Sequence, residues 1–282
     1  MSEQAVAENA SILASLNYLK SVDQRPVAYA YEPPAGVAPY SGINESTPVV
    51  IQNARVTAGP GELTLDKSGF QLLQHSTALR DFSEEQLIRD VYYPEVEAIL
   101  KRATGASKIV IFDHTLRDSE KGRRGASLRE PAGRVHNDQT FVSAPRRVKD
   151  HLSPEEAEIR LKNRFAIINV WRPIGRPVEQ FPLALCDART ISGDDLIPSD
   201  LVYRDKVGET YAFKFNPQHR WYYYPRLTPD EALLLKIYDS RTDGTARLTA
   251  HTAFEDPTAA ADAPPRRSIE VRALVFYPPE LH

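Results

Sequence analysis

The second half of this 282-residue sequence is a succession of short apolar runs, and this feature most limits the folds that the chain can adopt. Proline and glycine turns separate most of these runs, which is typical of consecutive β-strands. The expected strands cover residues 164–171, 182–187, 210–215, 219–224, 232–238, 246–254 and 268–277. Because the expected helices are concentrated in the first half, the pattern predicts a mainly β fold with supporting helices, a double-stranded β-helix of the jelly-roll or cupin-like kind.

An N-terminal helix is predicted for residues 9–20, so residues 1–40 are expected to form this helix and an extended, proline-rich arm. Four apolar residues fall on one face of the helix: Ile12, Leu13, Leu16 and Leu19. Two further helices have start signals in the sequence. One begins at Ser83 and ends at Gly105, and the other begins at Ser153.

Three more strands are predicted in the first half, at residues 49–51, 62–65 and 108–112. The segment 116–133 is charged and contains three glycines, so we expect a long loop and a candidate lid over a site. No linker or internal repeat divides the sequence, and a single domain is therefore expected for residues 1–282.

Composition excludes several classes of protein. The formal net charge is −3 and the basic residues form no sustained run, so a nucleic-acid partner is not expected. No apolar run reaches membrane-spanning length, and the start of the chain lacks a signal-peptide core. The single cysteine, Cys186, excludes an internal disulfide and is expected to be buried and unreactive. We therefore expect a cytoplasmic protein.

The chemistry is predicted to centre on His136 and Asp138. Residues two apart on a strand point to the same face, so this imidazole and this carboxylate project together. With one distant histidine they make a 2-His-1-carboxylate triad, which leaves positions open on ferrous iron for a cosubstrate and O₂. We favour His251 over His219 as the third ligand, because it precedes Arg266 by 15 residues, room for one turn between adjacent strands.

A carboxylate anchor is predicted beside this third ligand. The planar fork of Arg266 can pair both oxygens of a carboxylate, and Ser268 lies on the same side of the strand and can donate to the same group. Thr140 shares a face with His136 and Asp138 and is expected to touch the cosubstrate. Together these residues predict a site for Fe(II) and 2-oxoglutarate.

Four residues are candidates for contact with a small-molecule substrate: Arg172, His219, Tyr222 and Arg272. Arg172 stands in an apolar strand and needs a partner if buried, either a ligand carboxylate or an internal aspartate. Tyr222 belongs to a run of three tyrosines, of which one or two can face a pocket. Arg272 can hold substrate or pair within its own strand.

Several short motifs occur together along most of the chain. They are residues 136–140 (HNDQT), 169–174 (NVWRPI), 182–187 (PLALCD), 219–223 (HRWYY), 238–240 (YDS), 251–254 (HTAF) and 266–272 (RRSIEVR). In this combination and order the sequence resembles the AsaB/CmcJ-type hydroxylase/desaturase family, which includes gibberellin desaturase-like proteins. The resemblance runs from about residue 14 to residue 277.

The resemblance implies a non-haem Fe(II)/2-oxoglutarate-dependent oxygenase that hydroxylates or desaturates a small, specialised metabolite with O₂. Relatives often carry Glu at the position of Arg267, which leaves Arg266 as the better anchor, with Arg272 as an alternative. A Zn-dependent hydrolase on the same ligands and a catalytically inactive jelly-roll binding protein are the competing interpretations. The sequence does not predict the oligomeric state.

Overall fold

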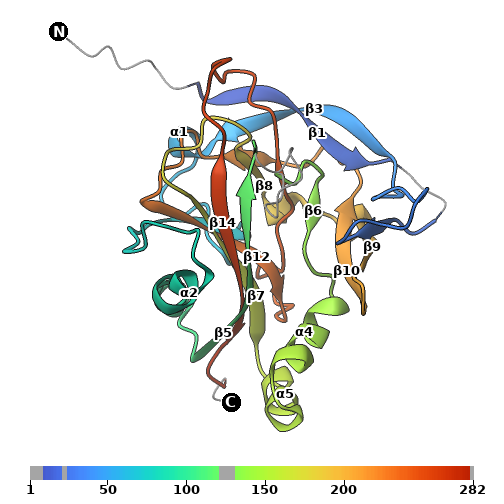
Figure 1. Ribbon diagram of the computed structural model, residues 1–282, viewed down its shortest axis with the longest axis vertical. Helices are drawn as coiled ribbons and strands as arrows, with labels where there is room; N and C mark the ends of the chain where they lie inside the picture. The colour runs from blue at the N-terminus through green and yellow to red at the C-terminus, as the bar shows by residue number, and fades with distance from the viewer. Residues whose placement is uncertain (1–8, 21–23, 121–130, 280–282) are drawn as a thin grey trace.

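Two β-sheets face each other in the computed structural model, which describes residues 9–20, 24–120 and 131–279 (Figure 1). Apolar side chains from both sheets meet in one buried cluster, for example Leu185 with Leu233 and Leu274. The short helices lie outside this pair of sheets. The predicted mainly β fold with supporting helices is confirmed.

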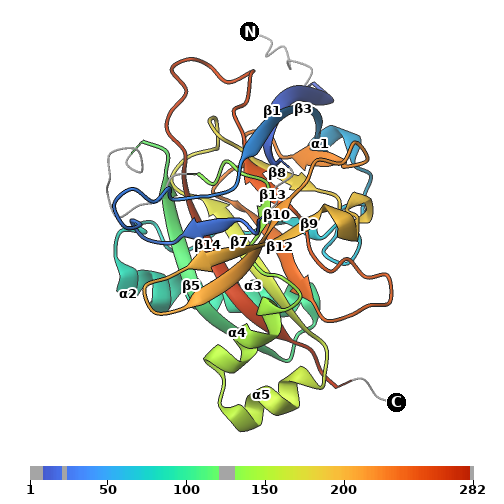
Figure 2. The ribbon, with the colours of Figure 1, turned by 90° about the vertical axis from the view of Figure 1, so that its right-hand side faces the viewer.

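The first sheet has nine strands in the described part of the chain, in the order β1-β3-β11-β8-β13-β6-β10-β9-β2. Its strands are β1 (Ser11–Leu19), β2 (Val27–Tyr29), β3 (Asn44–Asn53), β6 (His136–Asn137), β8 (Leu183–Cys186), β9 (Leu196–Val202), β10 (Val207–Phe213), β11 (Trp221–Tyr223) and β13 (His251–Ala253). The sheet curls, because buried residues of β1 pack against the outer face of its own middle strands, as Leu16 does in one cluster with Ala184 and Phe213 (Figure 2).

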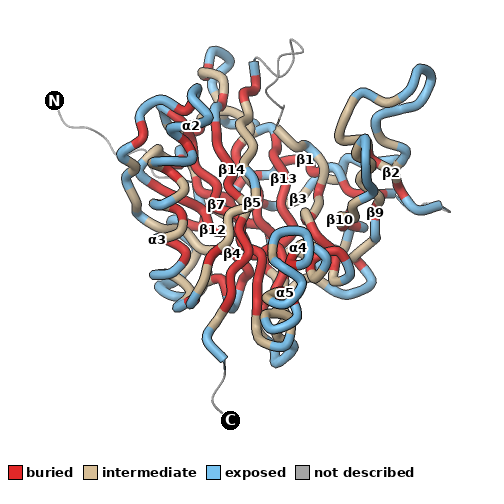
Figure 3. The backbone as a smooth tube through the Cα atoms, turned by 60° about the horizontal axis from the view of Figure 1, so that its bottom comes forward, coloured by how far each residue is buried: buried red, intermediate tan, exposed pale blue. Residues whose placement is uncertain are grey.

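The second sheet has the order β4-β12-β7-β14-β5. Its strands are β4 (Phe70–Gln74), β5 (Lys108–Asp118), β7 (Phe165–Pro173), β12 (Glu231–Asp239) and β14 (Arg267–Phe276). The central strands are buried along most of their length (Figure 3). Strands covered on both faces read as continuous apolar runs, which is why this part of the sequence could be recognised.

The two faces of β7 have different neighbours. Ile168 and Val170 point outward into a cluster with Val96 and Ile99 of a helix, whereas Ile167 and Trp171 point inward. The alternation follows from the two-residue period of a strand. It decides which polar residues of β7 and of its neighbour β14 can reach the space between the sheets.

Helices cover the outer face of the second sheet and one end of the molecule. They are α1 (Ala54–Thr57), α2 (Glu85–Leu87), the π-helical η1 (Ile88–Tyr92), α3 (Tyr93–Thr104), α4 (Ser143–His151), α5 (Pro154–Leu161) and the 3₁₀ turns η3 (Ala188–Thr190) and η4 (Gly193–Asp195). Gly105 ends α3 with a φ of 70°, and Ser153 caps α5 by accepting from the backbone of Glu156. Both boundaries were predicted, whereas the helix after Ser83 begins at Glu85 without a side-chain cap and α4 was not predicted.

The predicted N-terminal helix is wrong. Residues 11–19 form β1, which pairs with β3 and buries alternate residues: Ile12, Ala14, Leu16 and Tyr18. Leu13, which was placed on the apolar helical face, is 64% exposed. The short stretch fits both periods, and pairing with β3 selects the strand.

Two loop predictions also change. The segment 62–65 is not a strand but a series of turns, in which Thr64 accepts from the backbone of Ser68. The strand predicted at 108–112 continues to Asp118, so β5 includes the first residues of the candidate lid. The central part of that lid, residues 121–130, lies outside the described residues.

Among the described residues, none of the helices has the length and apolar character needed to cross a membrane.

Candidate metal centre

The three predicted metal ligands lie together between the two sheets. His136 is in β6, Asp138 follows it, and His251 is the first residue of β13. Because β6 and β13 are antiparallel neighbours, His136 and His251 are directly paired, and their ring centroids are 4.4 Å apart. One nitrogen or oxygen from each of the three side chains lies within 4.8 Å of the other two. Within the described part of the chain, no other histidine, cysteine or acidic residues gather in this way.

Each histidine can offer one nitrogen to the group. Nδ1 of His136 lies 2.7 Å from the backbone oxygen of Arg134, which can only accept, so Nδ1 donates and Nε2 is the nitrogen left to face the other ligands. This hydrogen bond also orients the ring of His136. Burial, together with the neighbouring His136, lowers the pKa of His251 to about 4, so this imidazole is neutral at neutral pH.

Asp138 provides the negative charge of the group. Burial opposes its ionisation, but Arg272 and the neighbouring histidines lower its pKa well below the usual value for a carboxyl group. Its Oδ1 lies 3.5 Å from Nε2 of His136. Two imidazoles and one carboxylate are the donor set of a non-haem iron site with open positions.

Arg266 and Ser268 carry buried donors that have no partner among the described residues. These donors are Nε of Arg266 and Oγ of Ser268, and the two residues are 3% and 1% exposed. One other nitrogen of Arg266 donates to the backbone oxygen of Phe181, and the guanidinium lies 5.4 Å from the ring centroid of Trp171. Burial lowers the pKa of Arg266 to about 9, so the group stays charged at neutral pH. Unpaired buried donors are costly, and a carboxylate would satisfy both.

Strand β7 relates these donors to the metal ligands through two inward residues, Asn169 and Trp171. Asn169 and Trp171 point inward from β7, and Asn169 donates to Asp138 over 2.8 Å, whereas Trp171 lies under Arg266. Two residues of a strand span roughly 7 Å. An extended five-carbon dicarboxylate covers about this distance, so the residues present fit an Fe(II) ion and a 2-oxoglutarate molecule side by side.

Comparisons with known proteins agree with this geometry. A protein-family model described as "Oxidoreductase/YMDC permease-like domain" matches residues 16–276. The hydroxylase/desaturase efuI of Hormonema carpetanum is 36% identical over 253 residues, which cover 82% of this chain and 83% of that protein. The chain belongs to the AsaB/CmcJ-type hydroxylase/desaturase family. The family resemblance of the sequence is therefore confirmed.

Other relatives define the enzyme class. The Fe(II)/2-oxoglutarate-dependent dioxygenase nvfI of Aspergillus novofumigatus is 38% identical over 226 residues, which cover 74% of this chain and 79% of that protein. A solved structure of the iron and alpha-ketoglutarate-dependent endoperoxidase NvfI matches with a TM-score of 0.85 at 29% identity, covering 95% of this chain and 98% of that chain. The protein is an Fe(II)/2-oxoglutarate-dependent dioxygenase with the jelly-roll fold.

Thr140 and Arg172 have partners away from the three predicted metal ligands. The hydroxyl of Thr140 donates to Glu209 and accepts from the backbone of Ser143 at the start of α4. Arg172 points to the outer face of β7, where it donates to the backbone oxygen of Pro229 over 2.8 Å. Its other nitrogens lie against Tyr92 and His75. These contacts do not support the expected roles of the two residues in cosubstrate and substrate binding.

His219 and Tyr222 are also part of the packing. His219 lies between Tyr18 and Asp195, at 3.0 Å and 3.1 Å from their oxygens, so it is neither a ligand nor a pocket residue. Tyr222 shares the inner face of the first sheet but lies two strands from His251, in an apolar cluster with Phe70. These contacts do not support the expected role of either residue in substrate binding.

Arg272 is close to the metal ligands but is not free to bind a ligand of its own. It donates to Asp138, Glu270 and Asp113. Asn169 and Glu270 were not among the predicted site residues. Asn169 donates to Asp138 and to Glu270, and Glu270 accepts from Arg272. The only available signal was a polar residue inside an apolar strand, as in the run Ile168-Asn169-Val170.

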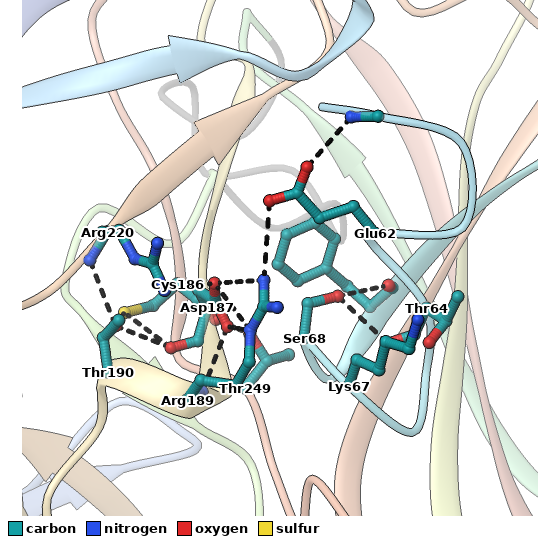
Figure 4. Close-up of polar contacts among 12 residues, drawn as sticks. Glu62, Thr64, Lys67, Ser68, Cys186, Asp187, Arg189, Thr190, Arg220 and Thr249 are labelled. Atoms are coloured by element: carbon teal, nitrogen blue, oxygen red, sulfur yellow. Dashed lines mark hydrogen bonds and ion pairs between the residues drawn. The ribbon is translucent and has the colours of Figure 1, made fainter. Parts of the chain in front are cut away.

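Cys186 has the structural role that was predicted for it. Figure 4 shows it at the end of β8, beside a network in which Asp187 accepts from Arg189 over 2.7 Å and lies 3.4 Å from Arg220. The thiol is buried and 3.7 Å from the hydroxyl of Thr190, and burial raises its pKa. A thiol in this state is not a nucleophile.

Proposed function

We propose that this dioxygenase binds Fe(II) through His136, Asp138 and His251 and binds 2-oxoglutarate through Arg266 and Ser268. One observation carries the assignment. Three converging metal donors and two buried donors without a partner among the described residues are reached from Asn169 and Trp171, two residues apart on the inner face of β7.

Each residue has a defined task in this proposal. Fe(II) and 2-oxoglutarate together supply the oxidation of a substrate C–H bond by O₂, in which 2-oxoglutarate becomes succinate and CO₂. Arg266 holds a carboxylate with its planar fork, and the ring of Trp171 sets the plane of that fork. The buried surroundings keep water away from the reacting atoms. The product is a hydroxylated or desaturated small molecule.

The substrate is proposed to bind in a cavity of about 690 Å³ that is lined by chain neighbours and contacts of these residues and not by the residues themselves. Ala253, two residues after His251 on the same strand, lines it, and so does Phe181, whose backbone oxygen accepts from Arg266. The described lining contains Glu255 and Asp256 but no basic residue. This charge pattern favours a neutral substrate over an anionic one.

The competing zinc hydrolase needs a glutamate that is free to act as a base near the metal. Glu270 is the acidic side chain that shares the partners Asn169 and Arg272 with Asp138. Both of its carboxylate oxygens accept hydrogen bonds. Oε1 accepts from Asn169 and Oε2 from Arg272, each over 2.8 Å. Although burial opposes ionisation, Arg272 lowers the pKa of Glu270. A carboxylate held in this way is a structural group and not a free base.

We also propose a cytoplasmic location. Cys186 is the only cysteine in the sequence and is a free, buried thiol, as expected for a protein of a reducing compartment.

Anaerobic titration with Fe(II) and 2-oxoglutarate tests the assignment. The full chain is expected to develop a weak visible charge-transfer band, which Zn(II) does not produce. His136→Ala is expected to abolish the band, because it removes one of three protein ligands. His219→Gln is the matched control, since His219 is a buried histidine of the same region that is bound to Tyr18 and Asp195. A band that persists in His136→Ala would refute the ligand set.

A further inference from the structure

The two oxygens of Asp138 have different surroundings. Oδ2 accepts from Nδ2 of Asn169 over 2.8 Å and from Nε of Arg272 over 3.1 Å. Oδ1 faces the other ligands, 3.5 Å from Nε2 of His136. Oδ2 is therefore held by two donors, whereas Oδ1 faces the other predicted metal ligands.

Arg272 is fixed on every side that it offers. Besides Asp138, its guanidinium donates to Oε2 of Glu270 over 2.8 Å, to Oδ1 of Asp113 over 3.1 Å and to Oγ1 of Thr115 over 2.9 Å. The side chain is only 13% exposed. Because the guanidinium is planar and rigid, these contacts fix the direction in which Nε points.

Asn169 completes a closed ring of contacts with the same groups. Its Nδ2 donates both to Asp138 and to Oε1 of Glu270, each over 2.8 Å. Asn169 and Arg272 are register partners on the neighbouring strands β7 and β14, so the two donors approach Oδ2 from one sheet. Glu270 binds both donors and so prevents either of them from turning away.

The free oxygen of Asp138 is the place where this ring supplies no donor. Arg272 hydrogen-bonds both carboxylates, through Oδ2 of Asp138 and Oε2 of Glu270. Oδ1 of Asp138 receives no hydrogen bond from the ring and lies beside His136. A divalent ion next to Oδ1 would add positive charge at that oxygen.

We propose that Asn169 and Arg272 are positioning residues for the iron: they hold Oδ2 of Asp138 so that Oδ1 alone is presented to the metal, and Glu270 keeps both donors in place. A carboxylate bound through one oxygen occupies one position on the metal and leaves the others open for cosubstrate and O₂. This inference rests on the proposed role of Asp138 as a ligand.

The affinity of the full chain for Fe(II) tests this proposal, measured anaerobically by calorimetry without 2-oxoglutarate or substrate. Asn169→Ala and Arg272→Lys are each expected to weaken Fe(II) binding by about 10- to 100-fold, the size of effect found when partners of metal ligands are removed. The lysine keeps the charge at position 272 and lacks the fork. The Fe(II) affinity of both variants is measured without turnover.

Matched controls separate positioning from general stability. Asn53→Ala removes a buried asparagine that bonds the backbone of Asn9, and Arg164→Lys alters a buried arginine that is paired with Asp239. Neither residue contacts Asp138. Both controls are expected to lower the melting temperature and to leave the Fe(II) dissociation constant within about twofold of the parent.

The outcomes are distinguishable. Unchanged Fe(II) affinity in Asn169→Ala and Arg272→Lys, or an equal loss of affinity in the two controls, would overturn the proposal and make the ring merely structural. Asp138→Ala is measured beside them. If it binds Fe(II) as tightly as the parent, the ligand assignment itself fails. If Asp138→Ala does not bind Fe(II) while the Asn169 and Arg272 variants bind it as tightly as the parent, only the positioning role fails.

Discussion

Arg266, just before β14, and Arg272, in the middle of that strand, differ in their partners. Around Arg266 and Ser268, buried donors lack partners among the described residues, and Phe181, which accepts from Arg266, lines a cavity. Around Glu270 and Arg272, the guanidinium and both carboxylate oxygens are hydrogen bonded. Six residues along the chain therefore separate an arginine with an unpaired donor from an arginine that holds Asp138.

The partners of the two arginines indicate different roles. Both side chains are charged and largely enclosed, but Arg266 has an unpaired donor and Arg272 does not. A buried polar group that the protein leaves unpaired is a candidate site for a ligand, because leaving it unpaired costs stability. A fully paired group contributes to the fold and to the position of its neighbours. Substitutions of these residues test the contrast.

The largest expected effect is at Arg272. Arg272→Met removes the cation that hydrogen-bonds both Asp138 and Glu270, which should lower the free energy of unfolding of the metal-free protein by roughly 3–5 kcal/mol. Denaturant unfolding measures this change. A loss below about 1 kcal/mol would mean that the contacts of Arg272 with Asp138 and Glu270 contribute little to stability.

Arg266→Met should have the reverse profile. The dissociation constant of 2-oxoglutarate is expected to rise about 100-fold, because charge-assisted hydrogen bonds contribute roughly 1.5–3 kcal/mol each. The ligand-free protein should remain within about 1 kcal/mol of the parent in unfolding free energy, since the substitution removes an unpaired buried donor. Calorimetry and denaturant unfolding measure the two quantities. Strong destabilisation with normal cosubstrate binding would reverse the roles of the two arginines.

Ser268→Ala is a smaller test of the same end. Its hydroxyl has no partner in the described structure, so its loss should leave the melting temperature unchanged. The affinity for 2-oxoglutarate should fall by about 5- to 10-fold, which corresponds to one ordinary hydrogen bond of about 1 kcal/mol. A drop in melting temperature without a change in affinity would show that the hydroxyl serves the fold.

Arg267→Ala should have the smallest effect. This side chain is 51% exposed and lies 3.7 Å from Asp118, so the pair is a surface ion pair worth about 0–1 kcal/mol. The affinities for Fe(II) and 2-oxoglutarate should stay within about twofold of the parent in the same titrations. A loss comparable to that of Arg266→Met would make Arg267 the anchor instead.

The pair His136 and Asp138 could be predicted from the sequence because its geometry is local, two residues apart on an extended segment. His251 was favoured on an expected turn between adjacent strands, and this premise is wrong, because β13 and β14 lie in different sheets. Most late strands were predicted as apolar runs bounded by turns, but β9 was not predicted, and only residues 251–253 of the expected strand 246–254 form a strand. The family resemblance added the enzyme class to these patterns.

Features that depend on distant pairing could not be predicted. Residues 11–19 fit a helical face and a strand alternation, and β3 decides between them from more than 20 residues away. The role of Asn169 depends on its register with Arg272, about 100 residues later in the chain. Arg172 was misassigned because the sequence shows that an arginine is in the strand but not which sheet face it takes.

Strand β1 hydrogen-bonds the backbone of residues 133–135, directly before His136. Nδ2 of Asn17 donates to the backbone oxygen of Gly133 over 2.7 Å, and the oxygen of Asn17 accepts from the backbone of Val135, the residue before His136. Gly133 and Asn17 both line the cavity as well. Removing residues 11–19 would leave all three proposed ligands in the chain but would remove both hydrogen bonds that hold the backbone before His136, so β1 contributes to the position of that histidine.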